Sequence, residues 1–288
     1  MKKLTTLSAL ALTIPALFAQ DAKPLADTKT TDEVILAPEA SKKADTSNVP
    51  ESYKKAINDF SNLPEAKRIA FLKKRQEAGI LFQNKRIIET LEATNDLKLI
   101  FEGDPQIMNL RGACYVELRD FDKATAEFEA SMAITGPSLN VMFNIGEVAF
   151  VAENWKEALD TFTKARELAP DEADDMVNII DLKLMLTHIA LAKDSSLSEE
   201  DKKAHSAKVA EYSKLHSFLD DTPYFYYATA ALHFSKGDKN KGKSFLDKGR
   251  RVYASNPAAL ASWEDTMTEY GYIQSYYGDK KANEEDGE

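Results

Sequence analysis

A fixed spacing recurs in the middle of this chain of 288 residues and limits the folds that it can adopt. Four pairs of similar residues differ by 34 in residue number, as 146 minus 112 shows: Gly112 and Gly146, Phe121 and Trp155, Ala124 and Ala158, and Phe128 and Phe162. The small residues allow two antiparallel helices to approach closely, and the large aromatic residues fill the space toward the next pair of helices. One such hairpin leaves an apolar face in water, so successive hairpins must stack to bury it.

Residues 105–172 resemble two tandem tetratricopeptide repeats. The matching positions are the first-helix glycine (Gly112, Gly146), the next aromatic residue (Tyr115, first unit only), the second-helix alanine (Ala124, Ala158), the second-helix aromatic residue (Phe128, Phe162), the later small residue (Ser131, Ala165) and the closing proline (Pro170). Methionine replaces the tryptophan that opens the family pattern, at Met108 and Met142. The resemblance implies an all-α, right-handed superhelical solenoid of helical hairpins and says almost nothing about function.

The repeat pattern is clearest in two units and weaker on either side of them. The clear units are 105–138 and 139–172, and degenerate units are expected at 71–104 and 223–256. An irregular hairpin is expected at 173–219 and a capping helix at 258–277, which completes a solenoid over 50–278. Atypical terminal units are usual in such repeat proteins.

The two ends of the chain differ in composition from this helical part. Lys2 and Lys3 precede an apolar run from Leu4 to Ala19, which predicts a signal peptide over 1–19. A retained membrane anchor is the alternative, although an apolar run of about 16 residues is short for a bilayer. Residues 20–49 are predicted to be a disordered linker and residues 279–288 an acidic tail. With no lipobox cysteine, the sequence predicts a periplasmic or secreted protein.

The charge and the cysteine content argue against several functions. The formal net charge is −10, and removal of Lys2 and Lys3 with the leader would make it −12. Such a chain repels phosphate backbones and anionic lipids, so we expect neither nucleic acid nor a membrane surface as partner. Cys114 is the only cysteine and cannot form an internal disulfide. We expect it to be a small buried residue rather than a nucleophile.

One phosphate-binding motif appears in the sequence. The segment GDKNKGKS, Gly237 to Ser244, fits the P-loop pattern, in which Lys243 would contact phosphates and Ser244 a magnesium ion. That motif requires a buried strand before it, whereas the preceding FYYATAALHFSK is alanine-rich and has helical spacing. A nucleotide-binding factor is therefore the disfavoured alternative.

No other cluster of residues predicts catalysis, a metal or a cofactor. The four histidines are His188, His205, His216 and His233. On one helix, His205 and His216 would be separated by roughly 16 Å, too far for a shared metal ion. An acidic cluster follows Pro170: Asp171, Glu172, Asp174 and Asp175. Carboxylates are favoured in a first helical turn, and these lack the ligand pattern of a calcium loop.

The resemblance implies that the first helix of each hairpin lines a concave, partner-binding groove. The residues expected to face it are Arg75, Phe82, Asn109, Val116, Glu117, Phe143, Glu147, Phe150, Val151, Tyr224, Tyr227 and Phe234. The alternative is that Phe143, Phe150 and Tyr227 pack in the core, because aromatic stripes at helical spacing are often core.

The function predicted from these observations is that of a non-catalytic interaction scaffold or adaptor of the cell envelope. Its partner would be a protein or peptide held in the groove. A self-associating structural protein is the remaining alternative.

Overall fold

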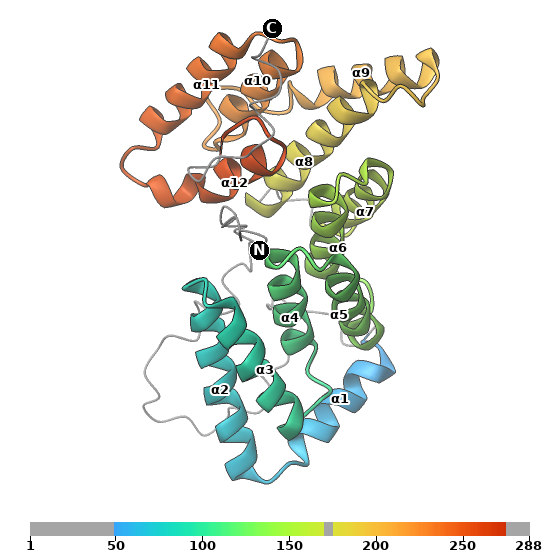
Figure 1. The fold of residues 1–288 in the computed structure, drawn as a ribbon, viewed down its shortest axis with the longest axis vertical. Coiled ribbons are helices and arrows are strands. Elements are labelled where there is room, and N and C mark those ends of the chain that lie inside the picture. Colours follow the sequence, from blue (N-terminus) through green and yellow to red (C-terminus); the bar gives the residue numbers. More distant parts are fainter. Residues whose placement is uncertain (1–48, 170–174, 275–288) are drawn as a thin grey trace, which may run out of the picture. The chain divides into compact units, whose positions relative to one another are not determined.

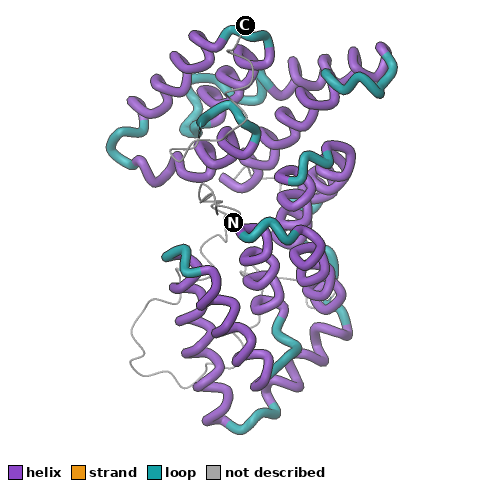
Figure 2. The backbone as a smooth tube through the Cα atoms, viewed as in Figure 1, coloured by secondary structure: helices purple, strands orange, loops and turns teal. Residues whose placement is uncertain are grey.

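The computed structural model describes residues 49–169 and 175–274. Within these two ranges every regular element is helical and no strand occurs, which confirms the all-α prediction (Figure 2). The predicted signal peptide, nearly all of the predicted linker and the acidic tail lie outside the described residues. So do Pro170 and its acidic neighbours Asp171, Glu172 and Asp174.

The described chain divides into two compact units, and the division falls between Asn144 and Ile145, inside helix α6. The unit that ends at Asn144 contains the first half of α6 and five complete helices: α1 (Glu51–Ser61), α2 (Glu65–Gln83), α3 (Ile87–Ile100), α4 (Pro105–Glu117) and α5 (Phe121–Thr135). Consecutive helices pack as hairpins, α2 on α3 and α4 on α5 (Figure 1). Helix α1 packs against α5, where the Ser52 hydroxyl donates to the Ile134 carbonyl oxygen at 2.7 Å.

The unit that starts at Ile145 contains the rest of α6 (Leu139–Val151) and six further helices: α7 (Trp155–Glu167), α8 (Asp175–Ala192), α9 (Glu199–Tyr212), α10 (Tyr224–Ser235), α11 (Lys239–Val252) and α12 (Ala261–Glu269), the last preceded by a 3₁₀ turn at Pro257–Leu260. Helix α8 is the central element, because it packs against α7, α9, α10 and α12. Every residue from 177 to 189 is accordingly buried, and most of these residues are apolar.

Two glycines occupy the tight crossings that the repeat predicts. A Cβ atom on Gly112 would lie 2.5 Å from Cε1 of Phe128, and one on Gly146 would lie 2.6 Å from Cε1 of Phe162. Only a residue without a side chain lets the aromatic ring lie on the backbone of the neighbouring helix. The structure thus confirms the close helix crossings that the repeat spacing predicts in these two units.

In the α10–α11 hairpin the two residue types exchange helices. The aromatic residue is Phe234 on the first helix, and the glycine is Gly242 on the second, where a Cβ atom would lie 2.6 Å from the ring. The two helices still approach closely, but the glycine is now on the second helix and the aromatic ring on the first. Simple stepping along the sequence by the repeat length could not find it.

The turns between paired helices repeat at the same spacing as the glycines. Lys85, Arg119 and Glu153 have φ values of +58°, +57° and +60°, and 119 minus 85 and 153 minus 119 both give 34. A residue in this left-handed region ends the first helix and redirects the chain into the second. Their recurrence makes α2–α3 a third hairpin of the same kind. It begins earlier than the expected 71–104, because α2 starts at Glu65.

None of the helices in the described ranges is long and apolar enough to cross a membrane.

Candidate interaction site

The structure buries most of the side chains that were expected to line the groove. Nine of the twelve are buried: Arg75, Phe82, Val116, Phe143, Glu147, Phe150, Val151, Tyr224 and Tyr227. The other three, Asn109, Glu117 and Phe234, are partly exposed. Even these have partners in two cases, since Lys85 Nζ lies 2.8 Å from Glu117 and the Phe234 ring stacks on Tyr272. The predicted residues therefore do not form one open surface.

Aromatic residues of α7, of α12 and of the segment after α12 account for part of this burial. The Phe150 ring lies 5.4 Å from the Trp155 ring and 6.1 Å from the Tyr270 ring, between centroids. The Tyr227 ring lies 5.6 Å from the Trp263 ring of α12. These contacts show that Phe150 and Tyr227 pack in the core instead of lining an open groove. The closing helix supplies partners that the repeat pattern does not reveal.

Two further groove residues form buried ion pairs. Arg75 Nη1 lies 3.2 Å from the carboxylate of Asp104, which also accepts the backbone N–H of Gln106 at the start of α4. Lys183 Nζ on α8 lies 2.7 Å from Glu147 on α6 and 2.7 Å from Glu269 at the end of α12. Each pair joins helices that are distant in sequence, so these charges hold the fold together rather than meet a ligand.

The charges around Lys183 are almost completely removed from water. The side chains of Lys183, Glu147 and Glu269 are 2%, 3% and 7% exposed, and the ammonium lies 4.5 Å from the centroid of the Phe150 ring. Burial raises the pKa of Glu147 to about 7, against the attraction of Lys183. The two carboxylates hold the pKa of Lys183 above its usual value despite its burial.

The remaining chemical candidates are structural as well. Cys114 is fully buried, and burial raises the pKa of its thiol to about 12, so it is protonated at neutral pH. The P-loop-like segment follows helix α10 instead of a strand. The backbone N–H of Lys241 donates to the Asp238 side chain and that of Gly242 to the Asp238 carbonyl oxygen. These amides do not form a phosphate-binding loop.

Two histidines meet between α8 and α9, a contact that the sequence did not suggest. The Nδ1 atoms of His188 and His205 are 2.9 Å apart, so one ring donates to the other. Burial, followed by the charge of His205, lowers the pKa of His188 to about 4. Within the described residues no group of three or more His, Cys, Asp or Glu side chains could hold a metal.

The histidine pair makes stability depend on pH. An unfolded histidine has a pKa of about 6.5, so the unfolded chain binds a proton more readily than folded His188 does. We therefore expect the contribution of His188 to stability to be lost as the pH falls from about 6.5 to about 4. The other charges that act on His188 are Lys208, which lowers the pKa, and Glu211, which raises it.

The expected result is a larger fall in melting temperature between pH 7.5 and pH 5 for the native protein than for His188→Gln. Glutamine keeps a polar side chain of similar size and removes the titration. Equal falls in the two proteins would show that His188 does not titrate in this range.

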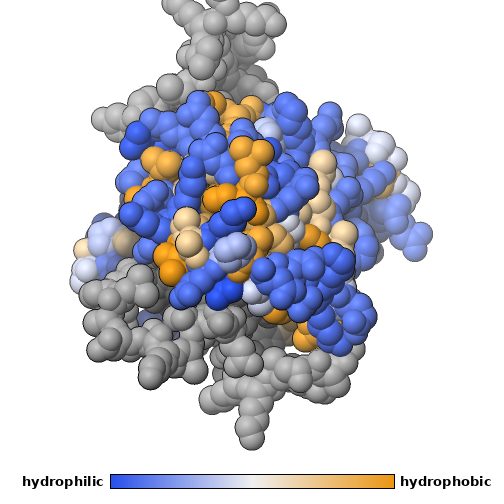
Figure 3. Space-filling model, turned by 90° about the horizontal axis from the view of Figure 1, so that it is seen from below, coloured by the Kyte–Doolittle hydropathy of each residue, from blue (hydrophilic) through white to orange (hydrophobic). Residues whose placement is uncertain are grey.

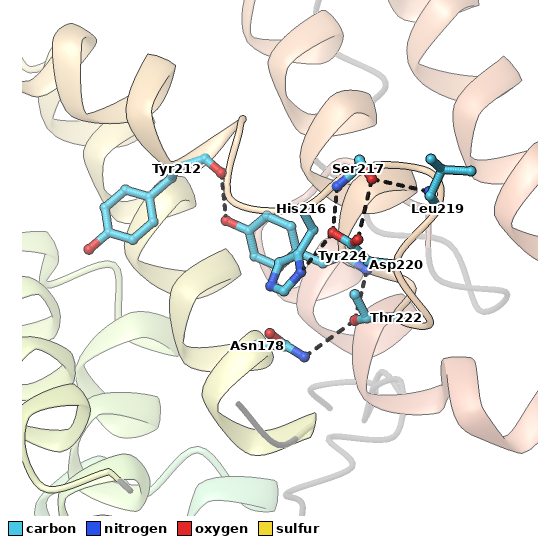
Figure 4. A network of polar contacts seen from close by, with 8 residues as sticks. All are labelled: Asn178, Tyr212, His216, Ser217, Leu219, Asp220, Thr222 and Tyr224. Carbon is cyan, nitrogen blue, oxygen red and sulfur yellow. Dashed lines mark hydrogen bonds and ion pairs between the residues drawn. The ribbon is translucent and has the colours of Figure 1, made fainter. Parts of the chain in front are cut away.

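A short loop between α9 and α10 is closed by several polar contacts of its own side chains. The Asp220 carboxylate accepts the Ser217 backbone N–H at 2.8 Å, and His216 Nδ1 lies 3.4 Å from the same carboxylate (Figure 4). That N–H holds the pKa of Asp220 below its usual value. The Ser217 hydroxyl in turn accepts the backbone N–H of Leu219 at 3.2 Å. These bonds close the turn that contains Phe218.

Both ends of the loop are tied to neighbouring helices. The Tyr224 hydroxyl donates to the Tyr212 carbonyl oxygen at 3.0 Å, which joins the end of α9 to the start of α10 (Figure 4). The Asn178 amide of α8 donates to the Thr222 hydroxyl at 3.3 Å. Polar contacts thus close the turn of this loop and tie its two ends to α8, α9 and α10.

Three large apolar side chains of this loop are exposed among polar ones. Leu215, Phe218 and Leu219 are 44%, 64% and 80% exposed. We call the side chains of these three residues the loop surface. On the face seen in Figure 3, apolar side chains form patches between hydrophilic ones, which is normal for a protein surface. Three large apolar residues within five positions on a braced loop are less usual and indicate a docking surface.

Comparison with known proteins gives likenesses among solved structures. The solved structure of YrrB, described as a TPR protein with an unusual peptide-binding site, is 18% identical in sequence and has a TM-score of 0.40. The match covers 73% of this chain and 96% of that one. Neither a protein-family model nor a curated protein matches the chain. The repeat assignment therefore rests on the crossing glycines and left-handed turns of this chain.

Proposed function

We propose that this chain is a non-catalytic interaction module of the cell envelope that binds a partner protein through its loop surface. The observation that carries the proposal is the combination of a hydrogen-bonded loop backbone and exposed Leu215, Phe218 and Leu219. An ordered apolar loop binds with a smaller loss of conformational entropy than a mobile one. Export is supported by Lys2 and Lys3 before the apolar run that ends at Ala19.

The proposal moves the binding surface away from the expected groove. Phe143 and Phe150 are 2% and 1% exposed, so a partner could reach them only if the helices separated. The loop surface needs no such opening. Large exposed apolar side chains that a partner can cover completely are the usual source of binding energy at protein interfaces.

The test is site-specific photo-cross-linking in cells that produce the full chain. A photoreactive phenylalanine is placed at Phe218 or Leu219, and at Ile88 or Leu99 of α3 as control sites, which are 58% and 87% exposed. We expect discrete adducts from the loop sites, in the periplasmic or secreted fraction, and none from α3. Adducts from neither pair of sites would contradict the proposed function.

A double substitution tests how much the exposed apolar side chains contribute to partner binding. Phe218→Ser with Leu219→Ser should lower adduct formation from a photoreactive residue at Leu215 by about tenfold or more, since two apolar contacts are removed. The melting temperature should hardly change, because exposed substitutions alter stability by about 0.5 kcal/mol or less. The matched control is Ile88→Ser with Leu99→Ser, which removes similar apolar surface and should leave the adduct unchanged.

A further inference from the structure

Helix α11 is strongly basic although the chain as a whole is acidic. It has six cationic residues (Lys239, Lys241, Lys243, Lys248, Arg250 and Arg251) and one acidic residue, Asp247, whereas the formal charge of the chain is −10. All seven charged side chains are exposed, and only Gly242, Leu246 and Gly249 of this helix are buried. The helix therefore presents a positive surface that attracts negative groups.

The two flanks of this positive surface differ. On one flank lie Lys239, Lys243 and Arg250, and the Arg250 guanidinium donates to the Glu264 carboxylate of α12 at 2.7 Å. On the opposite flank four residues follow one another at helical spacing: Lys241, Phe245, Lys248 and Val252. We call this second set the α11 stripe. It alternates a cation with an apolar residue along the helix.

The α11 stripe is continuous with the aromatic part of the loop surface. The Phe245 ring lies 6.1 Å from the Phe225 ring of α10, which lies 6.1 Å from the Phe218 ring, between centroids. Phe245 and Phe225 are partly exposed, and Val252 is 58% exposed. Lys248 Nζ lies 4.3 Å from the Phe245 centroid. Within the described ranges, Lys248 has no carboxylate partner.

We propose that the α11 stripe and Phe218 together bind an acidic amphipathic helix of the partner, a proposal that rests on the function above. Phe245 and Val252 are two helical turns apart, about 10.5 Å along the axis. A partner helix with apolar residues seven positions apart matches that distance. Carboxylates beside these residues would reach Lys241 and Lys248, so charge and apolar contact are complementary at the same time.

A nucleic acid fits this surface less well than such a helix. The exposed Asp220 and Asp221 follow the loop surface in sequence, and Asp238 lies 3.2 Å from Lys241 at the other end of the stripe. These carboxylates interrupt the positive surface and repel a continuous row of phosphates. The apolar Phe245 ring between the two lysines has no matching group on a phosphate backbone.

The test uses fluorescence anisotropy with the full chain and a labelled peptide. The peptide forms an amphipathic helix of about four turns, with leucines along one face and glutamates on both flanks. We expect saturable binding that weakens as salt is raised. Lys241→Glu with Lys248→Glu should raise the Kd by about tenfold or more, and Val252→Asp should also weaken binding.

The matched control is Lys239→Glu with Lys243→Glu, which makes the same change of charge on the opposite flank. It should change the Kd by about twofold at most, because local contacts rather than net charge hold the peptide. Circular dichroism should show intact helices in every variant. The proposal is overturned if the control variant weakens binding equally, or if the peptide does not bind. It is also overturned if a single-stranded oligonucleotide or phosphatidylglycerol vesicles bind as tightly.

Failure of this inference is distinguishable from failure of the proposed function. If photo-cross-linking from Phe218 or Leu219 gives adducts while the acidic peptide does not bind, the interaction function stands and the partner has a different chemistry. If neither experiment gives binding, both proposals fail.

Discussion

Lys183→Met is expected to lower the free energy of unfolding by about 3–5 kcal/mol, because it leaves two carboxylates buried without a cation. The ammonium of Lys183 lies 2.7 Å from both Glu147 and Glu269, and all three side chains are at most 7% exposed. The methionine side chain is similar in length to that of lysine, so the lost free energy of unfolding comes from the missing charge rather than from poorer packing. Denaturant unfolding followed by circular dichroism measures it.

The pH dependence of this loss is a sharper test of the mechanism. Burial raises the pKa of Glu147 to about 7, and removal of Lys183 takes away a charge that lowers it. When folding raises the pKa of a carboxyl group, the folded protein loses stability as the pH rises from the unfolded pKa to the folded pKa of that group. The destabilisation by Lys183→Met should therefore be larger at pH 8 than at pH 5.

Two comparisons keep the Lys183 prediction specific. Adding Glu147→Gln and Glu269→Gln to Lys183→Met should recover part of the stability, since the unpaired charges are then removed. The exposed ion pair of Lys164 with Asp160 serves as control, and Lys164→Met should cost about 1 kcal/mol at most. A loss of less than about 1 kcal/mol for Lys183→Met would show that the charges are not buried together.

Gly112→Val is expected to destabilise the chain by about 3 kcal/mol, through overpacking at a helix crossing. A Cβ atom at this position would lie 2.5 Å from Cε1 and 2.8 Å from Cζ of Phe128, a ring that is fully buried. The ring cannot move without disturbing the core of the α4–α5 hairpin, because protein interiors are close-packed. Thermal and denaturant unfolding measure the effect.

The control for Gly112→Val is Ala126→Val, on the exposed side of α5 in the same hairpin. It also introduces a β-branched side chain into a helix but meets no ring, so its cost should be below about 1 kcal/mol. Adding Phe128→Leu to Gly112→Val should restore part of the lost stability, because a smaller side chain makes room. Equal effects at the two positions would contradict a tight crossing at Gly112.

Much of the architecture could be predicted because the repeat is a local pattern. Gly112 and Gly146 identified the crossings, and the structure puts an aromatic ring against each of them. A further regularity could not be recognised in the sequence: Lys85, Arg119 and Glu153 follow one another at the same spacing and are the left-handed turn residues. Their side chains gave no warning, because glycine is the residue that usually marks such a conformation.

The candidate site could be predicted only in part. Val116 and Phe150 were assigned to a groove from their positions in the first helices, but burial depends on what packs against those positions. Lys183 is the residue with the clearest signal that was missed, since a lysine within the apolar sequence of α8 needs a buried partner. Glu147 and Glu269, its partners, are distant in sequence and could not be identified from spacing.

The sequence by itself determined the helices, the hairpin unit and the close crossings, because these depend on residues within one or two turns of each other or at a fixed interval. Only the tertiary structure decided which surfaces remain open. Helix α12 covers Tyr227, whereas the polar bonds of Asp220 and Tyr224 hold Phe218 and its neighbours outward. Exposure is a property of the whole packed unit, since each side chain is covered by residues that its local sequence does not contain.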